Sequence, residues 1–269
     1  MSIIERDLEP VLRKAASQYP VVSVTGPRQS GKTTLVRSVF DDHRYVSLEA
    51  PDQAAFARED PRGFLGQFDA GVILDEVQNV PELLSYLQTI VDEEPAPGRF
   101  VLTGSQHLAL SEAISQSLAG RTSINHLLPL SYGELQRFDD APEDLWEVVW
   151  SGGYPRIFDQ GIDPDDWLSN YVSTYVQRDV RQVLNVGDLT TFSTFLRLVA
   201  GRTAQERNLS TLGGDAGVSH NTARSWLSVL QTSFLIVTLP AFHRNFRKRL
   251  VKAPKLHLLE SGRVGYLVG

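Results

Sequence analysis

Apolar positions in the first 130 residues follow two alternating patterns. Short runs rich in β-branched residues occur at 21–24 (VVSV), 45–48 (YVSL), 72–75 (VILD), 100–103 (FVLT) and 124–128 (INHLL). The segments between them carry apolar residues at helical spacing. An earlier helix over residues 3–18 is indicated by Ile4, Leu8, Val11, Leu12 and Ala15. Strands that alternate with helices predict an α/β fold with a parallel sheet and covering helices.

The pattern changes after about residue 138. Residues 141–206 are predicted to be helical, with breaks at SGGYP (151–155) and NVGD (185–188). After them come two predicted helices, 208–216 and 219–231, and two strand-like runs, FLIVTLPAF (234–242) and KLHLLE (255–260). We predict three domains: 1–138, an α/β core; 139–206, a helical lid or linker; and 207–269, a small domain of helices and strands.

The stretch GPRQSGKTT at 26–34 lies between a predicted strand and a predicted helix, and it contains the pattern G-x-x-x-x-G-K-T. Glycines let backbone N–H groups turn toward phosphates, and the helix presents its positive N-terminus to them. Lys32 is predicted to reach the β- and γ-phosphates of ATP, and the Thr33 hydroxyl to bind Mg²⁺. The predicted nucleotide-binding residues are Gly26, Pro27, Arg28, Gln29, Ser30, Gly31, Lys32, Thr33 and Thr34.

A carboxylate pair follows the apolar run at 72–74. A buried strand there would deliver Asp75 beside the phosphate loop to hold the metal, and Glu76 would polarise a water molecule. This order favours hydrolysis over transfer to a second substrate; the alternative is a solvent-facing acidic pair. Guanine-specific proteins usually carry N-K-x-D, and NVGD does not match it. A transporter ATPase would carry an L-S-G-G-Q-like signature shortly before Asp75, and none is present there. The sequence therefore argues against both of these classes.

Composition excludes some classes of protein. The chain has 269 residues, a net charge of −6 and no cysteine, so disulfides and thiolate metal sites are excluded. Its longest apolar run, 234–242, is half the length that a membrane span needs. The first 20 residues interrupt their apolar positions with charges, unlike a signal peptide. We expect a soluble, cytoplasmic protein.

The segment from residue 208 to 242 predicts a helix-turn-helix with strands after it. Residues 208–259 contain seven Lys or Arg and one acid, which is +6 locally and leaves −12 for the remainder. A basic module on an acidic protein indicates an anionic partner, for which we expect DNA. The alternative is an assembly surface that contacts protein. The predicted DNA-binding residues are Arg224, Arg244, Arg247, Lys248 and Arg249.

An ordered set of motifs resembles a known family. GPRQSGKTTL, VILDEVQNVPELL, VLTGS, SLAGR, LPLSYGEL, GGYP and YVQRDV are similar to those of AAA+ ATPases of the archaeal-type group with a C-terminal winged helix. The resemblance implies an AAA+ core, a helical segment and a winged-helix domain. Glu49 and Glu260 stand where Asp is expected. Members usually continue into a restriction-endonuclease-like region that this sequence does not include, so nuclease activity is not carried over. Whether the last domain is truncated is left open.

The resemblance also implies catalytic roles beyond Lys32 and Glu76. Ser105, or alternatively Thr103, would sense the γ-phosphate. Arg121 precedes the last core strand, where such an arginine acts on the nucleotide of a neighbouring subunit; the alternative is a structural ion pair. Arg28, in the phosphate loop, and Arg156, after GGYP, are the alternative phosphate or interface arginines. Adjacent charges at Arg178 and Asp179 indicate packing or interface contacts.

These observations predict an Mg²⁺-dependent ATPase that assembles as a homo-oligomer and acts on DNA. No membrane partner is expected. The alternative is a nucleotide-dependent protein-interaction switch whose winged helix contacts protein. ATP turnover that responds to DNA would distinguish the two.

Overall fold

In the computed structural model, the described residues are 4–105, 117–176 and 189–269. They form two compact units that divide between Pro129 and Leu130. The first unit has two hydrophobic core clusters and the second unit has one. The predicted NVGD break and the pair Arg178 and Asp179 lie outside the described residues.

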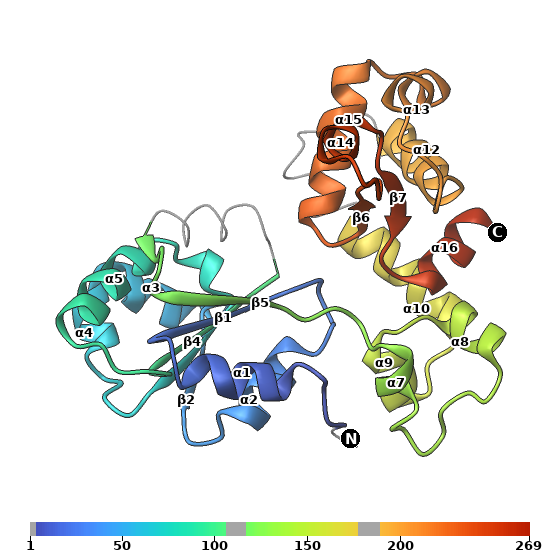
Figure 1. The fold of residues 1–269 in the computed structure, drawn as a ribbon. Coiled ribbons are helices and arrows are strands. Elements are labelled where there is room, and N and C mark those ends of the chain that lie inside the picture. Colours follow the sequence, from blue (N-terminus) through green and yellow to red (C-terminus); the bar gives the residue numbers. More distant parts are fainter. Residues whose placement is uncertain (1–3, 106–116, 177–188) are drawn as a thin grey trace. The chain divides into compact units, whose positions relative to one another are not determined.

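A five-stranded parallel sheet organises the first unit (Figure 1). Its strands are β1 (Val21–Thr25), β2 (Arg44–Ser47), β3 (Val72–Asp75), β4 (Phe100–Gly104) and β5 (Thr122–His126). They run in the order β2-β3-β4-β1-β5, and every pair is parallel. All five predicted strands are therefore present. The carboxyl ends of β1, β3 and β4 meet at one edge of the sheet, where parallel α/β sheets bind ligands.

Alternate side chains of the central strands enter cores on opposite faces of the sheet. Val22, Ile73 and Val101 pack with the helices on one face, while their neighbours in the strands pack on the other. One face carries α1 (Glu9–Ala16) and α2 (Lys32–Val39); the other carries α3 (Pro51–Glu59), α4 (Pro61–Leu65) and α5 (Leu83–Glu93). A short 3₁₀ turn, η1, spans Val77–Asn79. Burial on both faces explains the nearly continuous apolar runs of these strands.

The entry helix is shorter than the prediction over 3–18. Helix α1 begins at Glu9, and Pro10 lies in its first turn. Proline lacks a backbone N–H, and its ring clashes with the carbonyl four residues earlier, so the helix does not extend back from Pro10. Residues 4–6 are not helical, which leaves the Arg6 side chain available for contacts elsewhere in the unit.

The second unit is built mainly of helices. These are α7 (Tyr132–Leu135), α8 (Leu145–Ser151), α9 (Pro155–Gln160), α10 (Pro164–Tyr171) with a π-helical turn η2 (Val172–Val176), α12 (Leu189–Ala200), α13 (Leu209–Ala216), α14 (His220–Thr232), α15 (Phe246–Val251) and α16 (Ser261–Val268). Strands β6 (Ile236–Leu239) and β7 (Lys255–Leu258) form an antiparallel hairpin. One core extends from Tyr154 to Leu267 and includes the inward faces of α10, α12, α13 and α14.

The packing divides the chain differently from the predicted boundaries at 138 and 206. Leu130 already belongs to the second unit, and its N–H donates to the Gly153 carbonyl at 2.6 Å. The helices after 139 and the hairpin after 235 share a single core. The described residues therefore pack as two units. The predicted boundary at 206, between a helical lid and a winged-helix domain, stays a prediction.

A buried carboxylate connects the two ends of the second unit. Glu260 Oε1 accepts hydrogen bonds from the N–H groups of Gly153 (3.0 Å) and Gly262 (3.1 Å), and Oε2 accepts one from Arg263 N–H (2.8 Å). A Cβ on Gly152 would lie 1.6 Å from Glu260 Oε1, and Gly152 has a φ of +74°. The SGGYP motif is thus explained by the close approach of Glu260.

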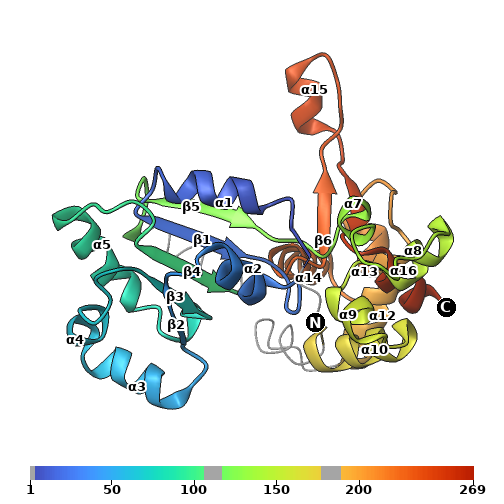
Figure 2. The ribbon, with the colours of Figure 1, turned by 90° about the horizontal axis from the view of Figure 1, so that it is seen from below.

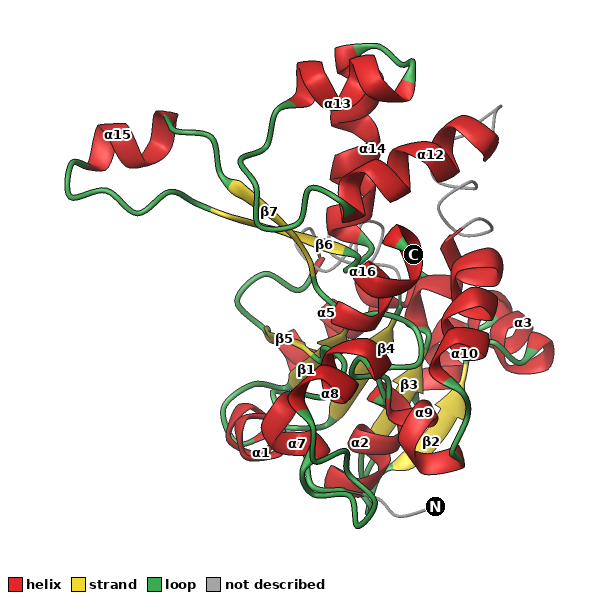
Figure 3. Cartoon of the chain, turned by 90° about the vertical axis from the view of Figure 1, so that its right-hand side faces the viewer, coloured by secondary structure: helices red, strands yellow, loops and turns green. Residues whose placement is uncertain are grey.

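The hairpin carries an extension between its strands. Leu239 pairs with Lys255 as the last ladder position, so residues 240–254 project beyond the paired strands. We call residues 240–254 the arm. In Figures 2 and 3 the arm, with α15 near its end, points away from the helices of its own unit.

Candidate nucleotide-binding site

The loop between β1 and α2 has the backbone that a phosphate-binding loop requires. Gly31 has a φ of +92° and Gln29 a φ of +61°, so the chain turns twice through the left-handed region before α2. A Cβ on Gly26 would lie 2.1 Å from the Leu127 carbonyl oxygen, which allows only glycine there. Predicted binding residues 26–34 therefore share one loop and the first turn of α2, at the carboxyl edge of the sheet.

Lys32 is buried within this loop. Its Nζ donates to the carbonyl oxygens of Gly26 (3.1 Å) and Pro27 (2.9 Å). Burial lowers the pKa of Lys32 to about 8, although the nearby carboxylates of Glu76 and Asp75 act in the opposite direction. When a nucleotide binds, the Lys32 ammonium can replace these carbonyl contacts with phosphate oxygens, which carry more negative charge.

Asp75 lies beside Thr33, as the sequence predicts for a metal site. The Thr33 hydroxyl is 3.1 Å from both carboxylate oxygens of Asp75. Two further hydroxyl groups bind the same carboxylate: Tyr45 Oη donates to Oδ2 at 2.7 Å, and Thr103 Oγ1 donates to Oδ1. Burial first, and then its bond to Asp75, raise the pKa of Tyr45 to about 12, so Tyr45 remains a donor at neutral pH.

Glu76 adopts a left-handed backbone conformation, with a φ of +56°, directly after β3. Its N–H donates to Thr103 Oγ1 at 3.2 Å. Its Oε2 accepts from Ser105 Oγ (2.9 Å), Ser105 N–H (3.2 Å) and the Gln78 amide. Non-glycine residues rarely adopt this conformation, and it aims the carboxylate at the end of β4.

This set of donors fits a nucleotide triphosphate and its cation. The Thr33 hydroxyl and the Asp75 carboxylate are oxygen ligands of the kind that Mg²⁺ takes when phosphates complete its shell. Among the described residues, no group of three or more His, Asp or Glu could hold a metal ion by itself. Thr33 and Asp75 supply only part of a Mg²⁺ coordination shell, so the pair suits a cation that also binds phosphate oxygens.

Two residues of this site were missed by the sequence analysis. Arg6 is buried; its Nη1 donates to the Ser30 carbonyl (2.9 Å) and its Nη2 to the Leu128 carbonyl (2.9 Å), so it supports the phosphate loop from outside. Tyr45 orients Asp75 from the neighbouring strand β2. Neither contact follows from spacing along the chain; only the strand order β2-β3 could have suggested Tyr45.

Arg121 lies at the opposite edge of the same sheet. Its backbone carbonyl accepts from Val21 N–H, where β1 begins, and its Nη2 donates to Asp92 Oδ2 at 2.8 Å. It is thus in the ion pair that the sequence analysis gave as the alternative, and it does not meet Lys32 in its own chain. Arg28 lies in the loop, half-buried, whereas Arg156 is exposed in the second unit and donates to Gln160.

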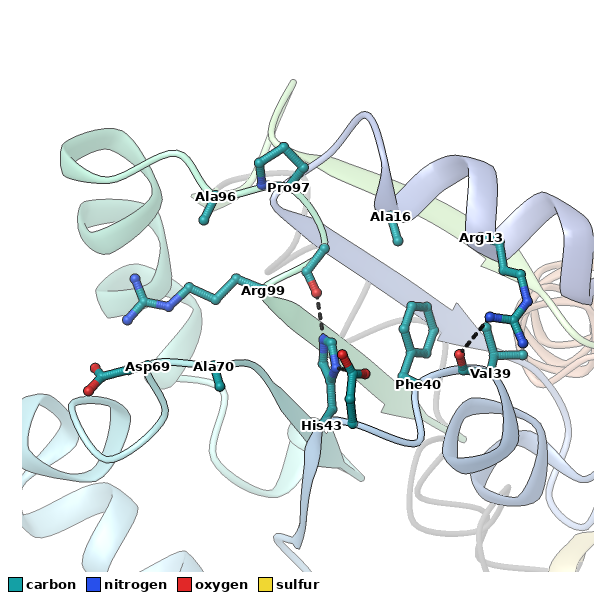
Figure 4. A pocket seen from close by; sticks show the side chains of 12 residues that line it. Arg13, Ala16, Val39, Phe40, His43, Asp69, Ala70, Ala96, Pro97 and Arg99 are labelled. Carbon is teal, nitrogen blue, oxygen red and sulfur yellow. Dashed lines mark hydrogen bonds and ion pairs between the residues drawn. The ribbon is translucent and has the colours of Figure 1, made fainter.

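A cavity of about 450 Å³ lies at that same edge, beside the segments that lead into β2, β3 and β4 (Figure 4). It is lined by Arg13, His43, Asp69 and Arg99 among others. His43 is one of the lining residues, and its Nε2 is hydrogen-bonded to the Gly98 carbonyl at 2.8 Å. Because the phosphate loop leaves the sheet at the other edge, this cavity is not the nucleotide site.

The predicted DNA-binding residues all belong to the second unit. Arg224 is exposed on α14, and Arg244, Arg247 and Arg249 are exposed on the arm. The side chain of Lys248 is not described. The predicted helix pair and strand pair are present as α13, α14, β6 and β7, and their identity as a winged helix stays a prediction.

In the described parts of the chain, every helix is too short or too polar to cross a bilayer.

Comparison with known proteins agrees with this geometry. Residues 18–136 match the family model described as an AAA domain, and residues 142–269 match one described as a domain of unknown function (DUF8612). The first part of the chain thus matches an AAA domain, as the motifs predict, and the rest matches a domain of unknown function.

Relatives align with all or nearly all of this chain. Uncharacterized protein Rv2008c of Mycobacterium tuberculosis is 30% identical over 272 residues, covering 100% of this chain and 60% of that protein. Uncharacterized protein MJ1544 of Methanocaldococcus jannaschii is 20% identical over 289 residues, covering 96% of this chain and 64% of that protein. The chain spans less than two thirds of the length of these relatives.

A solved structure has the same fold. The Walker-type ATPase PABY2304 of Pyrococcus abyssi aligns with a TM-score of 0.66 at 16% identity, covering 98% of this chain and 96% of that one. At this identity the likeness extends to the fold.

Proposed function

We propose that this protein hydrolyses ATP with the help of Mg²⁺, as an oligomer, and that it acts on DNA through its second unit. The observation that carries the proposal is the cluster of Lys32, Thr33, Asp75 and Glu76 at one edge of the sheet. The match to an AAA domain supports it.

Each residue of the cluster has a role that its contacts support. Lys32 and the loop N–H groups bind the phosphates, while Thr33 and Asp75 would hold Mg²⁺, which neutralises charge on the phosphate oxygens when bound. Glu76 accepts the proton of the attacking water. Ser105 and Thr103 hold Glu76 through its carboxylate and its N–H, so they position this base rather than contact the water themselves.

Two variants separate binding from hydrolysis. Lys32→Ala should lose nucleotide binding, because the phosphates lose a charged donor. Glu76→Gln should still bind ATP but turn it over at least ~100-fold more slowly, the usual weight of a general base. Fluorescent-nucleotide titration and phosphate release measure the two quantities. Parental turnover by Glu76→Gln would refute the role of Glu76.

The action on DNA needs its own measurement. ATP turnover is compared without DNA and with single-stranded, duplex and branched DNA, while light scattering gives the mass of the assembly with and without ATP. We expect turnover to rise with at least one DNA. If no DNA changes ATP turnover and the protein binds none of them, the results would instead favour a nucleotide-dependent protein-interaction switch.

A further inference from the structure

The arm holds one large apolar side chain almost entirely in solvent. Phe242 is 92% exposed, the highest value among the exposed large hydrophobic residues of the described chain. It lies in the arm, three residues after Leu239, the last residue of β6. Such a ring offers a binding partner a flat apolar surface that costs little to desolvate.

A cation lies next to the ring. The guanidinium carbon of Arg249 lies 5.8 Å from the centre of the Phe242 ring. The same guanidinium donates from Nε (3.3 Å) and Nη2 (3.2 Å) to the His243 carbonyl. These bonds place Arg249 beside the ring, and at 92% exposure a second flat group still has access to Phe242.

Charge around the ring selects an anionic partner. The arm contains Arg244, Arg247, Lys248, Arg249 and Lys252, and residues 216–259 contain no acid at all. The nearest preceding acid, Asp215, is in an ion pair with Arg202. A partner of this surface must therefore carry several negative charges close to flat rings, as nucleic acids do.

We infer that Phe242 is a stacking platform for an unpaired base of DNA, flanked by phosphate contacts from the arm; this inference rests on the proposed action on DNA. A paired base already stacks on its neighbours, and extruding it costs a few kcal/mol, whereas an unpaired base avoids that cost. The arm should thus prefer DNA that contains unpaired bases. A membrane surface fits less well, because α15 has only six residues and interfacial helices are commonly much longer.

The experiment uses the full chain and three DNA probes of equal phosphate number: a thymine-rich single strand, a duplex, and a duplex with a short gap. Each probe carries 2-aminopurine, in the gapped probe within the unpaired segment. Phe242→Ala should weaken binding to the single strand and the gap about 5- to 150-fold, the weight of one stacked base, and duplex binding less than 2-fold. Phe242→Trp should restore binding to the unpaired probes.

Matched variants of the same arm isolate the ring. Val251→Ala removes another exposed apolar side chain (77% exposed) and should change nothing. Neutralising Arg244, Arg247 and Lys252 together, which keeps Arg249 beside the ring, should weaken binding to all probes and flatten the log–log salt slope by roughly 2 to 3, while Phe242→Ala should leave the slope unchanged.

Failure of the inference can be told apart from failure of the proposed function. If the parental protein binds none of the probes, both fail. If it binds DNA but Phe242→Ala, or Phe242→Leu, binds unpaired probes as well as the parent does, only the stacking role fails. Vesicles of phosphatidylcholine with phosphatidylserine are tested in parallel; binding that depends on Phe242 there, and not on DNA, would assign the arm to a membrane.

Discussion

Lys32 combines two requirements that conflict at the scale of a single residue. It must be charged to bind phosphate, yet burial favours its neutral form and lowers its pKa to about 8. The folded chain therefore releases this proton at a lower pH than the unfolded chain does. The destabilisation from burying the charge is present below pH 8 and disappears as the pH rises from about 8 to the unfolded value of 10.5.

A proton linkage to nucleotide binding follows. Above about pH 8 the free protein has lost the Lys32 proton, so binding a triphosphate must take one up, and affinity should fall by up to tenfold per pH unit. Calorimetric titration at pH 9, in buffers of different ionisation enthalpy, should show uptake approaching one proton. The same titration at pH 6.5 should show almost none. Equal uptake at both pH values would contradict this assignment.

At the scale of elements, the strands were predictable and the contacts between elements were not. Buried parallel strands need apolar side chains on both faces, so β1, β3 and β4 stand out as runs, and Asp75 is found because it ends such a run. Pro10 was visible in the sequence, yet helical spacing around it outweighed its effect in the prediction of a helix over 3–18. Arg6 and Ser30 are 24 positions apart and Glu260 and Gly153 are 107 apart, and no local pattern encodes such pairs.

The contact of Glu260 with the SGGYP turn gives a prediction for stability. Gly152→Ala places a methyl group on the Glu260 carboxylate at a φ of +74°, and we expect a loss of about 3 kcal/mol, from backbone strain and displaced hydrogen bonds. The control is Gly161→Ala in the same unit: its φ is +58° but nothing lies within 4 Å, so it should lose only ~1 kcal/mol.

Denaturant unfolding followed by tryptophan fluorescence measures this difference. All four tryptophans, at 146, 150, 167 and 226, lie in the second unit, so the signal reports that unit alone. Similar losses in the two variants would mean that Glu260 moves aside without penalty.

At the scale of the molecule, Arg121 provides a test of whether one subunit contributes to ATP hydrolysis in the site of its neighbour. If Arg121 acts on the nucleotide of a neighbouring subunit, Arg121→Ala should bind ATP normally but hydrolyse it ~10³-fold more slowly. Mixing it with Lys32→Ala should restore part of the turnover, because a good arginine then faces a good phosphate loop.

Asp92→Asn is the matched control for that experiment. It removes the ion pair and keeps the arginine, so it should retain turnover if Arg121 acts in trans. Two results would contradict the role in trans: Asp92→Asn loses as much turnover as Arg121→Ala does, and the mixtures stay as inactive as their components although subunits exchange. Arg121 would then act only through its ion pair with Asp92.

The distance along the chain between Gly153 and Glu260 also affects synthesis on the ribosome. The first unit has all its strands once residue 126 has left the exit tunnel, and it can fold while translation continues. The second unit cannot close until Glu260 and α16 emerge, because Leu267 belongs to its core and the Gly153 N–H needs its acceptor. Throughout that interval Tyr154, Trp167 and Phe195 lack part of their packing, and nascent chains stalled before residue 260 should be the form that chaperones bind and proteases cut.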